Sequence, residues 1–387
     1  SHFVMAQGSY VDFENPFITN FENRFEKNIA LRTHFGYEKN WDRVSLAYRL
    51  GFEGGINDIL IRNYDNNRGN EGNPQNFDQL NNRSGFFFLS QKLNFGGKLF
   101  TDISLSLNSN SYGWERTFPR SENGNVRFSN QWLPNFGITY LITKGFSIRG
   151  KIGKGNSAPT NEEIRSSDQQ FNAALHPEYG WNREIGIRKQ FGNSVFIEGS
   201  YFDFNMKDAI VRRQNEAGQE YFVNSGETSQ RGLEVLVESG RFNLRNNFLS
   251  HLKFRFAGSF YNFSFENYRQ NNSDFSGNGL TGVPKTSISS LVNFTFFRKL
   301  AVDYSHFYTS KLPLNDANSV WSEPSLVGNI QFRFPVDFDK TRVNLYLQIQ
   351  NLYNEDYVLG FDINAFGNRY YNPAAKRNFI FGVKVDF

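Results

Sequence analysis

The stretch NFIFGVKVDF, from Asn378 to Phe387, decides the fold class of this chain. Every second side chain from Phe379 onward is a phenylalanine or a valine, and the side chains between them are mixed in character. Successive side chains of a β-strand point to opposite faces of a sheet, so this pattern predicts a strand with one apolar face. The same two-residue period recurs in residues 44–50, 103–107, 146–152, 252–260 and 343–349. We therefore predict an all-β protein.

Composition argues against helical membrane proteins and nucleic-acid binders. The chain has 387 residues with Phe 43 and Tyr 18, yet its mean hydropathy is -0.56, so large rings are interleaved with polar side chains. The longest apolar runs, such as Phe86 to Leu89, fall far short of the roughly 18 residues that a membrane-spanning helix needs. Lys+Arg 42 against Asp+Glu 38 gives a net charge of +4 that is spread along the chain, so nucleic acid is not an expected partner. Cys 0 excludes disulfides and thiolate metal sites.

Short turns and long polar segments alternate between the predicted strands. The short turns lie near Gly96, Lys144, Gly192 and Arg298, and the long segments are residues 64–83, 109–133, 155–181, 268–284, 311–325 and 353–374. This wiring is typical of an outer-membrane barrel, and we count roughly sixteen strands. The strands around residues 194–213 and 219–239 are longer than a membrane crossing needs, which predicts a hairpin that projects beyond the bilayer.

A soluble sandwich or propeller is the alternative fold, because it also alternates and also has turns. Soluble strands bury faces rich in Val, Ile and Leu, whereas the apolar face here is dominated by Phe. The other face carries Lys, Arg, Glu and Ser within the strands, which suits a wet lumen, and no blade motif repeats. We therefore favour a transmembrane antiparallel β-barrel, whose closure pairs every backbone group inside the lipid.

Several motifs go beyond the strand pattern. They are GKGNSAPTNEEI (Gly153 to Ile164), LHPEYGWNREIGIR (Leu175 to Arg188), the segment Asp208 to Val235, TGVPKTSIS (Thr281 to Ser289), PLNDANSV (Pro313 to Val320) and the closing stretch Asn351 to Phe387. Together they resemble the barrel of TonB-dependent outer-membrane receptors, and they are most similar to iron-complex (siderophore) receptors of the Bacteroidetes type.

The resemblance implies a 22-stranded barrel with an N-terminal plug and a segment that contacts TonB. Neither the plug nor that segment is recognisable here, so we expect residues 1–387 to be the C-terminal barrel portion of one transmembrane domain, with the first six strands outside this sequence. The location implied is the outer membrane of a Gram-negative bacterium. The partners implied are outer-membrane lipid, TonB through a plug region, a ferric-chelate ligand and the barrel-assembly machinery. A surface lipoprotein or other outer-membrane subunits are further candidates.

No catalytic constellation emerges, and we expect no enzyme activity. The five histidines have no metal-ligand spacing, and the neighbours Ser305 and His306 are a common chance pair. The segment Asn63 to Asn82 is dense in oxygen ligands, but it lacks the spacing of a calcium loop, so a solvated extracellular loop is the favoured interpretation. Glu184 and Glu234 are expected to pair with neighbouring Lys or Arg. No resident cofactor is expected, because iron would enter only as part of a transported chelate.

The resemblance places the ligand at the extracellular mouth, where aromatic and cationic side chains of the loops would contact a ferric chelate. The candidates are Tyr112, Trp114, Arg116, Tyr179, Trp181, Arg212, Arg213, Tyr221, Trp321, Arg369, Tyr370 and Tyr371. For each of them the alternative is an aromatic girdle at the membrane interface. The terminal Phe387 resembles the signal that the barrel-assembly machinery reads.

The leading hypothesis is an energy-coupled importer of a ferric siderophore or similar iron complex. A glycan or peptide importer of the same superfamily is the nearest alternative. A structural or docking barrel within an outer-membrane complex is the alternative from another class.

Overall fold

A computed structural model describes residues 1–386 except residues 19, 217, 225, 245–247 and 271–272. The candidate assembly signal, Phe387, lies outside the described residues and stays a prediction. The chain divides into two compact units, which are described separately. The first unit comprises Ser1–Thr139, Lys151–Trp181 and Lys207–Asn224, and the second comprises Tyr140–Gly150, Asn182–Met206 and Ser225–Phe387. The expectation of one continuous domain stays a prediction.

The all-β prediction is confirmed, because strands dominate the described part of the chain. Its main antiparallel sheet has 18 strands, of which β6 and β14 are short, so the described residues contain sixteen long strands, as predicted. None of the described helices is long and apolar enough to cross a membrane. The elements of the N-terminal half are β1 (His2–Pro16), β2 (Phe21–Asn40), β3 (Val44–Asn67), β4 (Asn70–Phe95), β5 (Leu99–Phe118), β6 (Glu122–Arg127), β7 (Gln131–Thr143), β8 (Phe146–Ser157), α1 (Asn161–Ile164) and β9 (Glu178–Phe191).

The C-terminal half continues the hairpin-connected order. Small two-stranded sheets, β11–β12, β16–β17 and β22–β23, interrupt it. Its elements are β10 (Val195–Lys207), β11 (Ile210–Gln214), β12 (Glu220–Asn224), β13 (Glu227–Ser239), β14 (Phe242–Asn243), β15 (Leu249–Asn267), β16 (Arg269–Gln270), β17 (Ser273–Asp274), β18 (Thr286–Phe296), β19 (Leu300–Thr309), β20 (Ser325–Asp337), β21 (Arg342–Gln350), β22 (Val358–Phe361), η1 (Phe366–Asn368), β23 (Tyr371–Pro373) and β24 (Asn378–Asp386).

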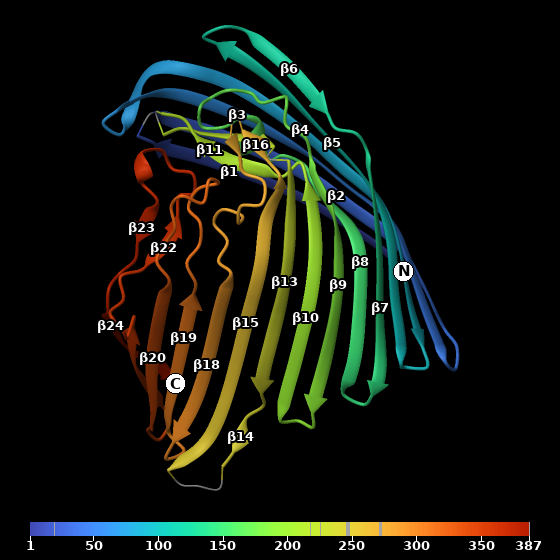
Figure 1. Ribbon diagram of the computed structural model, residues 1–387, viewed down its shortest axis with the longest axis vertical. Helices are drawn as coiled ribbons and strands as arrows, with labels where there is room; N and C mark the ends of the chain where they lie inside the picture. Colours follow the sequence, from blue (N-terminus) through green and yellow to red (C-terminus); the bar gives the residue numbers. More distant parts are fainter. Residues whose placement is uncertain (19, 217, 225, 245–247, 271–272, 387) are drawn as a thin grey trace. The chain divides into compact units, whose positions relative to one another are not determined.

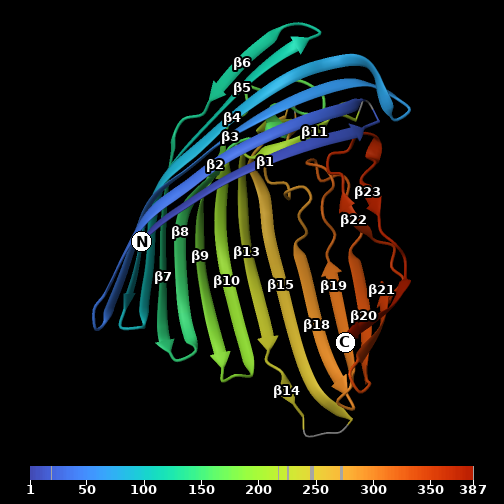
Figure 2. The ribbon, with the colours of Figure 1, turned by 180° about the vertical axis from the view of Figure 1, so that it is seen from behind.

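In the first unit, β1 to β5 run side by side as long antiparallel strands (Figure 2). The pairing of β3 with β4 continues to Asn67 opposite Asn70. The prediction of a long loop at residues 64–83, and of a solvated loop from Asn63 to Asn82, is therefore wrong. The segment is polar, but its backbone groups form the hydrogen bonds of an antiparallel sheet. It is therefore the end of the β3–β4 hairpin and not an irregular loop.

The apolar face of β3 to β5 is confirmed. Leu50 lies opposite Leu89, which in turn lies opposite Leu105, and all three side chains are exposed. The row formed by Gly54, Gly85 and Ser109 carries almost no side chain on this face. We name the rows from Val44 to Phe52 and their cross-strand partners the apolar band.

Beyond this row, apolar burial moves to the other face of the sheet. Ile59, Ile61 and Leu80 form one buried cluster there. A second cluster contains Tyr112, Phe128, Ile164 and Leu175. The strands thus have an apolar exposed face near the short turns and an apolar buried face at their far ends, where loop 158–177 covers them.

In the second unit, β15, β18, β19 and β20 lie side by side (Figure 1). Phe332, Leu347 and Phe381 are successive cross-strand partners on one face of β20, β21 and β24. The opposite face is polar, and Arg333 Nη2 lies 2.6 Å from Asp303 Oδ2 on it. Glu184 pairs with Arg149 at 2.9 Å, as predicted, whereas the described partner of Glu234 is the Tyr261 hydroxyl.

Turn chemistry agrees with the sequence. Gly96, Gly145 and Gly192 all have positive φ, a conformation that glycine adopts without a Cβ clash. Within the predicted pair 194–213 and 219–239, β11 and β12 form a separate two-stranded sheet from Ile210 opposite Asn224 to Gln214 opposite Glu220. Its projection beyond the bilayer stays a prediction.

Candidate ligand-binding site

Loop 158–177 begins with a local signal that the sequence motif already contains. In APTNEEI, the Thr160 hydroxyl accepts a hydrogen bond from the Glu163 backbone N–H at 3.3 Å, and the Glu163 carboxylate accepts one from the Thr160 backbone N–H at 2.6 Å. This reciprocal capping box starts α1 directly after β8. The turn of helix brings Ile164 into the core and Arg165 to the polar network described next.

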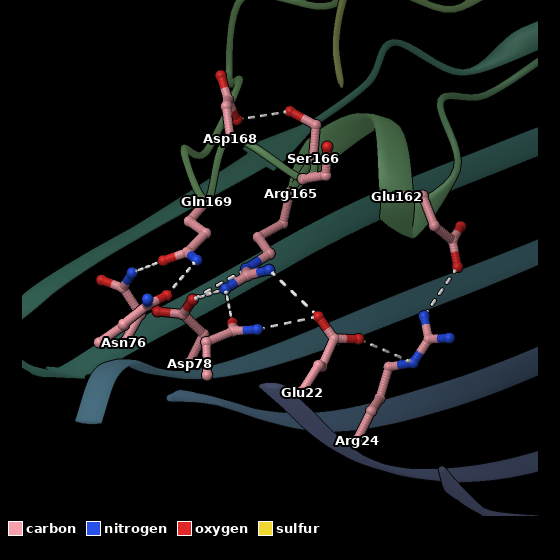
Figure 3. A network of polar contacts seen from close by, with 12 residues as sticks. Glu22, Arg24, Asn76, Asp78, Glu162, Arg165, Ser166, Asp168 and Gln169 are labelled. Atoms are coloured by element: carbon pink, nitrogen blue, oxygen red, sulfur yellow. Dashed lines mark hydrogen bonds and ion pairs between the residues drawn. The ribbon is translucent and has the colours of Figure 1, made fainter. Parts of the chain in front are cut away.

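Asp78 is the centre of a buried ion cluster at the far end of the first unit (Figure 3). Arg116, its cross-strand partner on β5, donates from Nε at 2.7 Å, and Arg165 donates to the same carboxylate at 2.8 Å from Nη2. Arg165 also donates to Asn63 Oδ1 at 2.6 Å, and Asn63 donates to Glu22 at 3.1 Å. Two cations, Arg116 and Arg165, therefore lie beside two carboxylates, Asp78 and Glu22. The Asp78 side chain is 0% exposed.

A more exposed chain of contacts surrounds this cluster. Arg24 on β2 lies 3.3 Å from Glu26. Figure 3 shows Arg24 between Glu22, at 3.6 Å, and Glu162 of α1, at 3.3 Å. Gln169 donates to Gln75 at 2.9 Å and accepts from Asn76. Loop 158–177 is thus attached to β2, β3, β4 and β5 by the buried ion cluster around Asp78 and by these more exposed contacts.

Three ligand candidates of the first unit are part of this packing. Arg116 also donates to the Gln169 carbonyl at 2.6 Å, and its guanidinium lies 5.0 Å from the Phe171 ring centre. Trp114 stacks on Phe171 at 5.3 Å. Tyr112 donates its hydroxyl to the Pro159 carbonyl, and burial raises its pKa to about 12 at a position beyond the apolar band. All three have internal partners, and their contact with a ligand stays a prediction.

The β11–β12 hairpin carries the next group of candidates. Arg212 is partly exposed and lies 2.6 Å from Glu220, whereas Arg213 is buried opposite Tyr221. The hairpin is held to loop 158–177, because the Glu220 N–H donates to Ser167 at 2.6 Å. Adjacent arginines on one strand therefore have different surroundings, as alternation predicts.

Tyr179 and Trp181 lie on β9 at the edge of the same unit. The Lys154 ammonium is 5.0 Å from the centre of the Tyr179 ring, and the Trp181 side chain is exposed. This arrangement fits an aromatic girdle as well as it fits a ligand contact.

In the second unit, the buried carboxylate of Asp316 binds side chains of the loops that carry the remaining candidates. Asp316 accepts from Tyr268 at 3.0 Å, from Asn364 at 3.1 Å and from the Thr281 hydroxyl. The donors belong to two loops, 268–284 and 353–374, and Asp316 itself lies in a third loop, 311–325. Asp316 therefore joins all three loops.

Candidates on these loops differ in exposure. Tyr370 is buried in a cluster with Leu312 and Leu314, whereas Arg369 and Tyr371 are exposed. Trp321 is partly exposed, donates from Nε1 to the Asn318 carbonyl at 2.8 Å and lies under the Lys311 ammonium at 5.4 Å. Asp78, Arg165 and Asp316 are not predictable as site residues, because single acids and arginines in polar segments give no local signal in the sequence.

A family model for the TonB dependent receptor-like β-barrel matches residues 3–352. The chain belongs to this family. TonB-dependent receptor barrels are outer-membrane proteins, so the apolar band is the face that contacts lipid. The family is one of receptors and not, in general, of enzymes.

Solved structures share the TonB-dependent barrel fold at low sequence identity. The ferric citrate transporter FecA in its unliganded form has a TM-score of 0.79 at 14% identity and covers 100% of this chain and 59% of its own. The siderophore receptor PiuA from Acinetobacter baumannii has a TM-score of 0.72 at 15% identity, covering 94% of this chain and 56% of its own. The copper transporter OprC has a TM-score of 0.68 at 12% identity, covering 95% and 58%. This chain therefore spans less than two thirds of the length of these proteins, and at such identities the likeness concerns the fold.

Proposed function

We propose that this chain is the barrel portion of an importer for a ferric siderophore or a similar iron complex. Membership of the TonB-dependent receptor family supports transport, and structural neighbours named as ferric citrate and siderophore receptors support an iron chelate. The observation that carries the proposal is the β11–β12 hairpin, which offers a partly exposed arginine and a partly exposed tyrosine beyond the membrane strands. Cations and aromatic rings are what an anionic aromatic chelate requires.

Exposure divides the candidate residues into two proposed roles. The contacts to the chelate are assigned to the side chains that are partly or fully exposed, namely Arg212, Tyr221, Trp321, Arg369 and Tyr371. The buried or internally bonded side chains shape the loops, and these are Tyr112, Trp114, Arg116, Arg213 and Tyr370. Tyr179 and Trp181 are assigned to the lipid interface.

The rest of the transport cycle is part of the same proposal. A plug region would couple the barrel to TonB, and the assembly machinery would read Phe387. Iron arrives within the chelate, so the barrel has no resident cofactor. A Bacteroidetes-type receptor in a Gram-negative outer membrane is the subgroup proposed, and a surface lipoprotein is a further proposed partner.

In the full-length receptor, Arg212→Ala is expected to weaken uptake of the cognate chelate roughly ten- to hundredfold in apparent affinity. A charge-assisted contact contributes about 1.5 to 3 kcal/mol, which gives a change of this size. The measurement is radiolabelled-iron uptake under iron limitation, at equal surface expression, in a strain that lacks other receptors.

Two matched variants separate binding from packing. Glu220→Gln removes the ion-pair partner of Arg212 but leaves the cation, so uptake should persist if the arginine contacts ligand. Arg342→Ala removes an exposed arginine at a short-turn end and should leave uptake unchanged. If Arg212→Ala and Glu220→Gln reduce uptake equally, the Arg212–Glu220 ion pair has a structural role only. If deletion of the receptor leaves uptake of every chelate intact, the glycan or peptide importer and the docking barrel become the leading hypotheses.

A further inference from the structure

A cavity of about 360 Å³ lies in the second unit, where the neighbouring strands β19 and β20 end away from their short turns (Figure 1). Phe307 and Thr309 of β19 line it together with their cross-strand partners Val327 and Ser325 of β20. Phe307 and Thr309 follow Asp303 by an even number of residues, so alternation places them on the polar face that carries the Asp303 ion pair. The cavity therefore opens on the face of the sheet that does not contact lipid, and its size is that of a small-molecule site.

The segment that follows β21 supplies the rest of the lining. Gln350 is the last residue of β21, and Tyr357 immediately precedes β22. The Asn351 backbone N–H donates to Asn329 Oδ1 at 3.0 Å, and the Asn351 side chain both donates to the Glu355 carbonyl and accepts from the Glu355 N–H at 2.8 Å. Asn351 is 1% exposed. Buried hydrogen bonds thus fix this side of the cavity before a ligand binds.

Four polar side chains of the lining can bind a ligand without losing a protein partner. In the part of the chain that the structure describes, the hydroxyls of Thr309, Ser325 and Tyr357 and the amide of Gln350 make no hydrogen bond to another residue. A hydroxyl and an amide can each donate and accept. None of the side chains that line the cavity is charged.

This lining argues against an anionic ligand and against an extended peptide. Two ion pairs adjoin it in the sequence, Arg333 with Asp303 at 2.6 Å and Lys376 with Asp356 at 2.7 Å, but all four residues lie outside the lining. An anion would therefore find no free cation there. A peptide that adds a strand needs an open sheet edge, whereas β19 pairs with β18 and β20, and β20 pairs with β19 and β21.

We propose that this cavity, named here the neutral pocket, binds an uncharged sugar ring. One face of a pyranose presents C–H groups that pack on an aromatic ring, and Phe307 is 46% exposed on the polar face of β19. The hydroxyls at the edge of a sugar both donate and accept, as do the hydroxyls and the amide of the lining. None of the residues assigned to the chelate lines the neutral pocket, so the inference goes beyond the iron-importer proposal and does not rest on it.

The test uses the purified full-length receptor in a detergent that has no sugar headgroup. The probes are the methyl glycosides of glucose, galactose, mannose and N-acetylglucosamine, and saturation-transfer NMR titrations give their dissociation constants. At least one glycoside is expected to bind. Methyl glucuronide has the same ring as the glucoside but carries a carboxylate, and it should bind about tenfold more weakly, because its charge would be buried without a partner.

Variants of the lining identify the pocket as the binding site. Phe307→Ala and Gln350→Ala should each weaken binding by about two- to tenfold, which is the loss of one aromatic contact or one neutral hydrogen bond. Phe307→Tyr should retain binding, because it keeps the ring. Leu291→Ala is the matched control: Leu291 lies opposite Ser305 on the same face, is 38% exposed and does not line the pocket.

A trisaccharide of the sugar that binds best separates two sources of the ring. Tighter binding than that of the methyl glycoside supports a free glycan chain, and equal binding supports a single sugar substituent of a larger molecule. Both results agree with the neutral pocket.

Four results would overturn the proposal. They are the absence of binding by all the glycosides, undiminished binding by the Phe307→Ala/Gln350→Ala double variant, equal binding of the glucuronide, and an equal loss of binding in Leu291→Ala. Heat-modifiable gel mobility verifies that each variant is folded before the comparison. The outcome is independent of the iron-uptake test of Arg212→Ala, so failure of one proposal leaves the other intact.

Discussion

Replacing Asp78 with alanine is expected to destabilise the attachment of loop 158–177 by about 3 to 5 kcal/mol. The change leaves Arg116 and Arg165 buried without their shared carboxylate, and an uncompensated buried charge costs about this much. Arg165 is 6% exposed, so water cannot replace the lost partner without opening the loop. The measurement is hydrogen exchange of the backbone amides of residues 161–177 in the full-length receptor.

Asp58→Ala is the matched control, because Asp58 lies on an adjacent strand but on the exposed face. Its loss should change the exchange rates little. Exchange in the loop that stays slow after Asp78→Ala would show that the two arginines find other partners, and that the ion cluster does not hold the loop.

Leu347→Arg is expected to destabilise the folded barrel by about 2 to 4 kcal/mol, which is the cost of an arginine on the lipid face near the bilayer midplane. Leu347 lies between Phe332 and Phe381, whose side chain is 70% exposed, so nothing in the described residues shields an added charge. Folding into vesicles, followed by heat-modifiable gel mobility at increasing urea, measures the effect.

Gln348→Arg tests the same strand one residue further on. Gln348 lies between Gln331 and Ile380 on the polar face, where an arginine can remain hydrated. Gln348→Arg should therefore change the stability of the folded barrel little. Similar losses for the two neighbours would contradict the assignment of the lipid face.

The sequence predicted the strands wherever one face is apolar over several residues. The alternation from Phe379 to Val385 became β24, and its exposed face matches the predicted one. The prediction failed at residues 64–83, because polar composition there resembles a loop. What holds this segment in strands is long-range: Asp78 bonds to Arg116, 38 residues away, and to Arg165, 87 residues away. No local pattern encodes those pairs.

The candidate site shows the same limit. Arg116 and Tyr112 were candidates because cations and aromatic rings in polar segments suit a chelate. An arginine that contacts a ligand and an arginine that neutralises a buried acid look the same in the sequence, however. Adjacent Arg212 and Arg213 could be assigned different surroundings from strand alternation alone. The contact of Arg212 with Glu220 follows only from the structure, in which β11 pairs with β12.

The position of Asp316 constrains how this receptor could be re-engineered. A common strategy for changing specificity is to graft a single surface loop from another receptor. Here a grafted segment in place of 268–284 would remove Tyr268 and Thr281 at once, and one in place of 353–374 would remove Asn364, so a buried carboxylate would lose donors in either chimera. Each lost partner costs about 1 to 3 kcal/mol. Exchange of residues 268–284, 311–325 and 353–374 as one cassette would avoid that mismatch, and the same coupling would make natural variation in the three loops correlated.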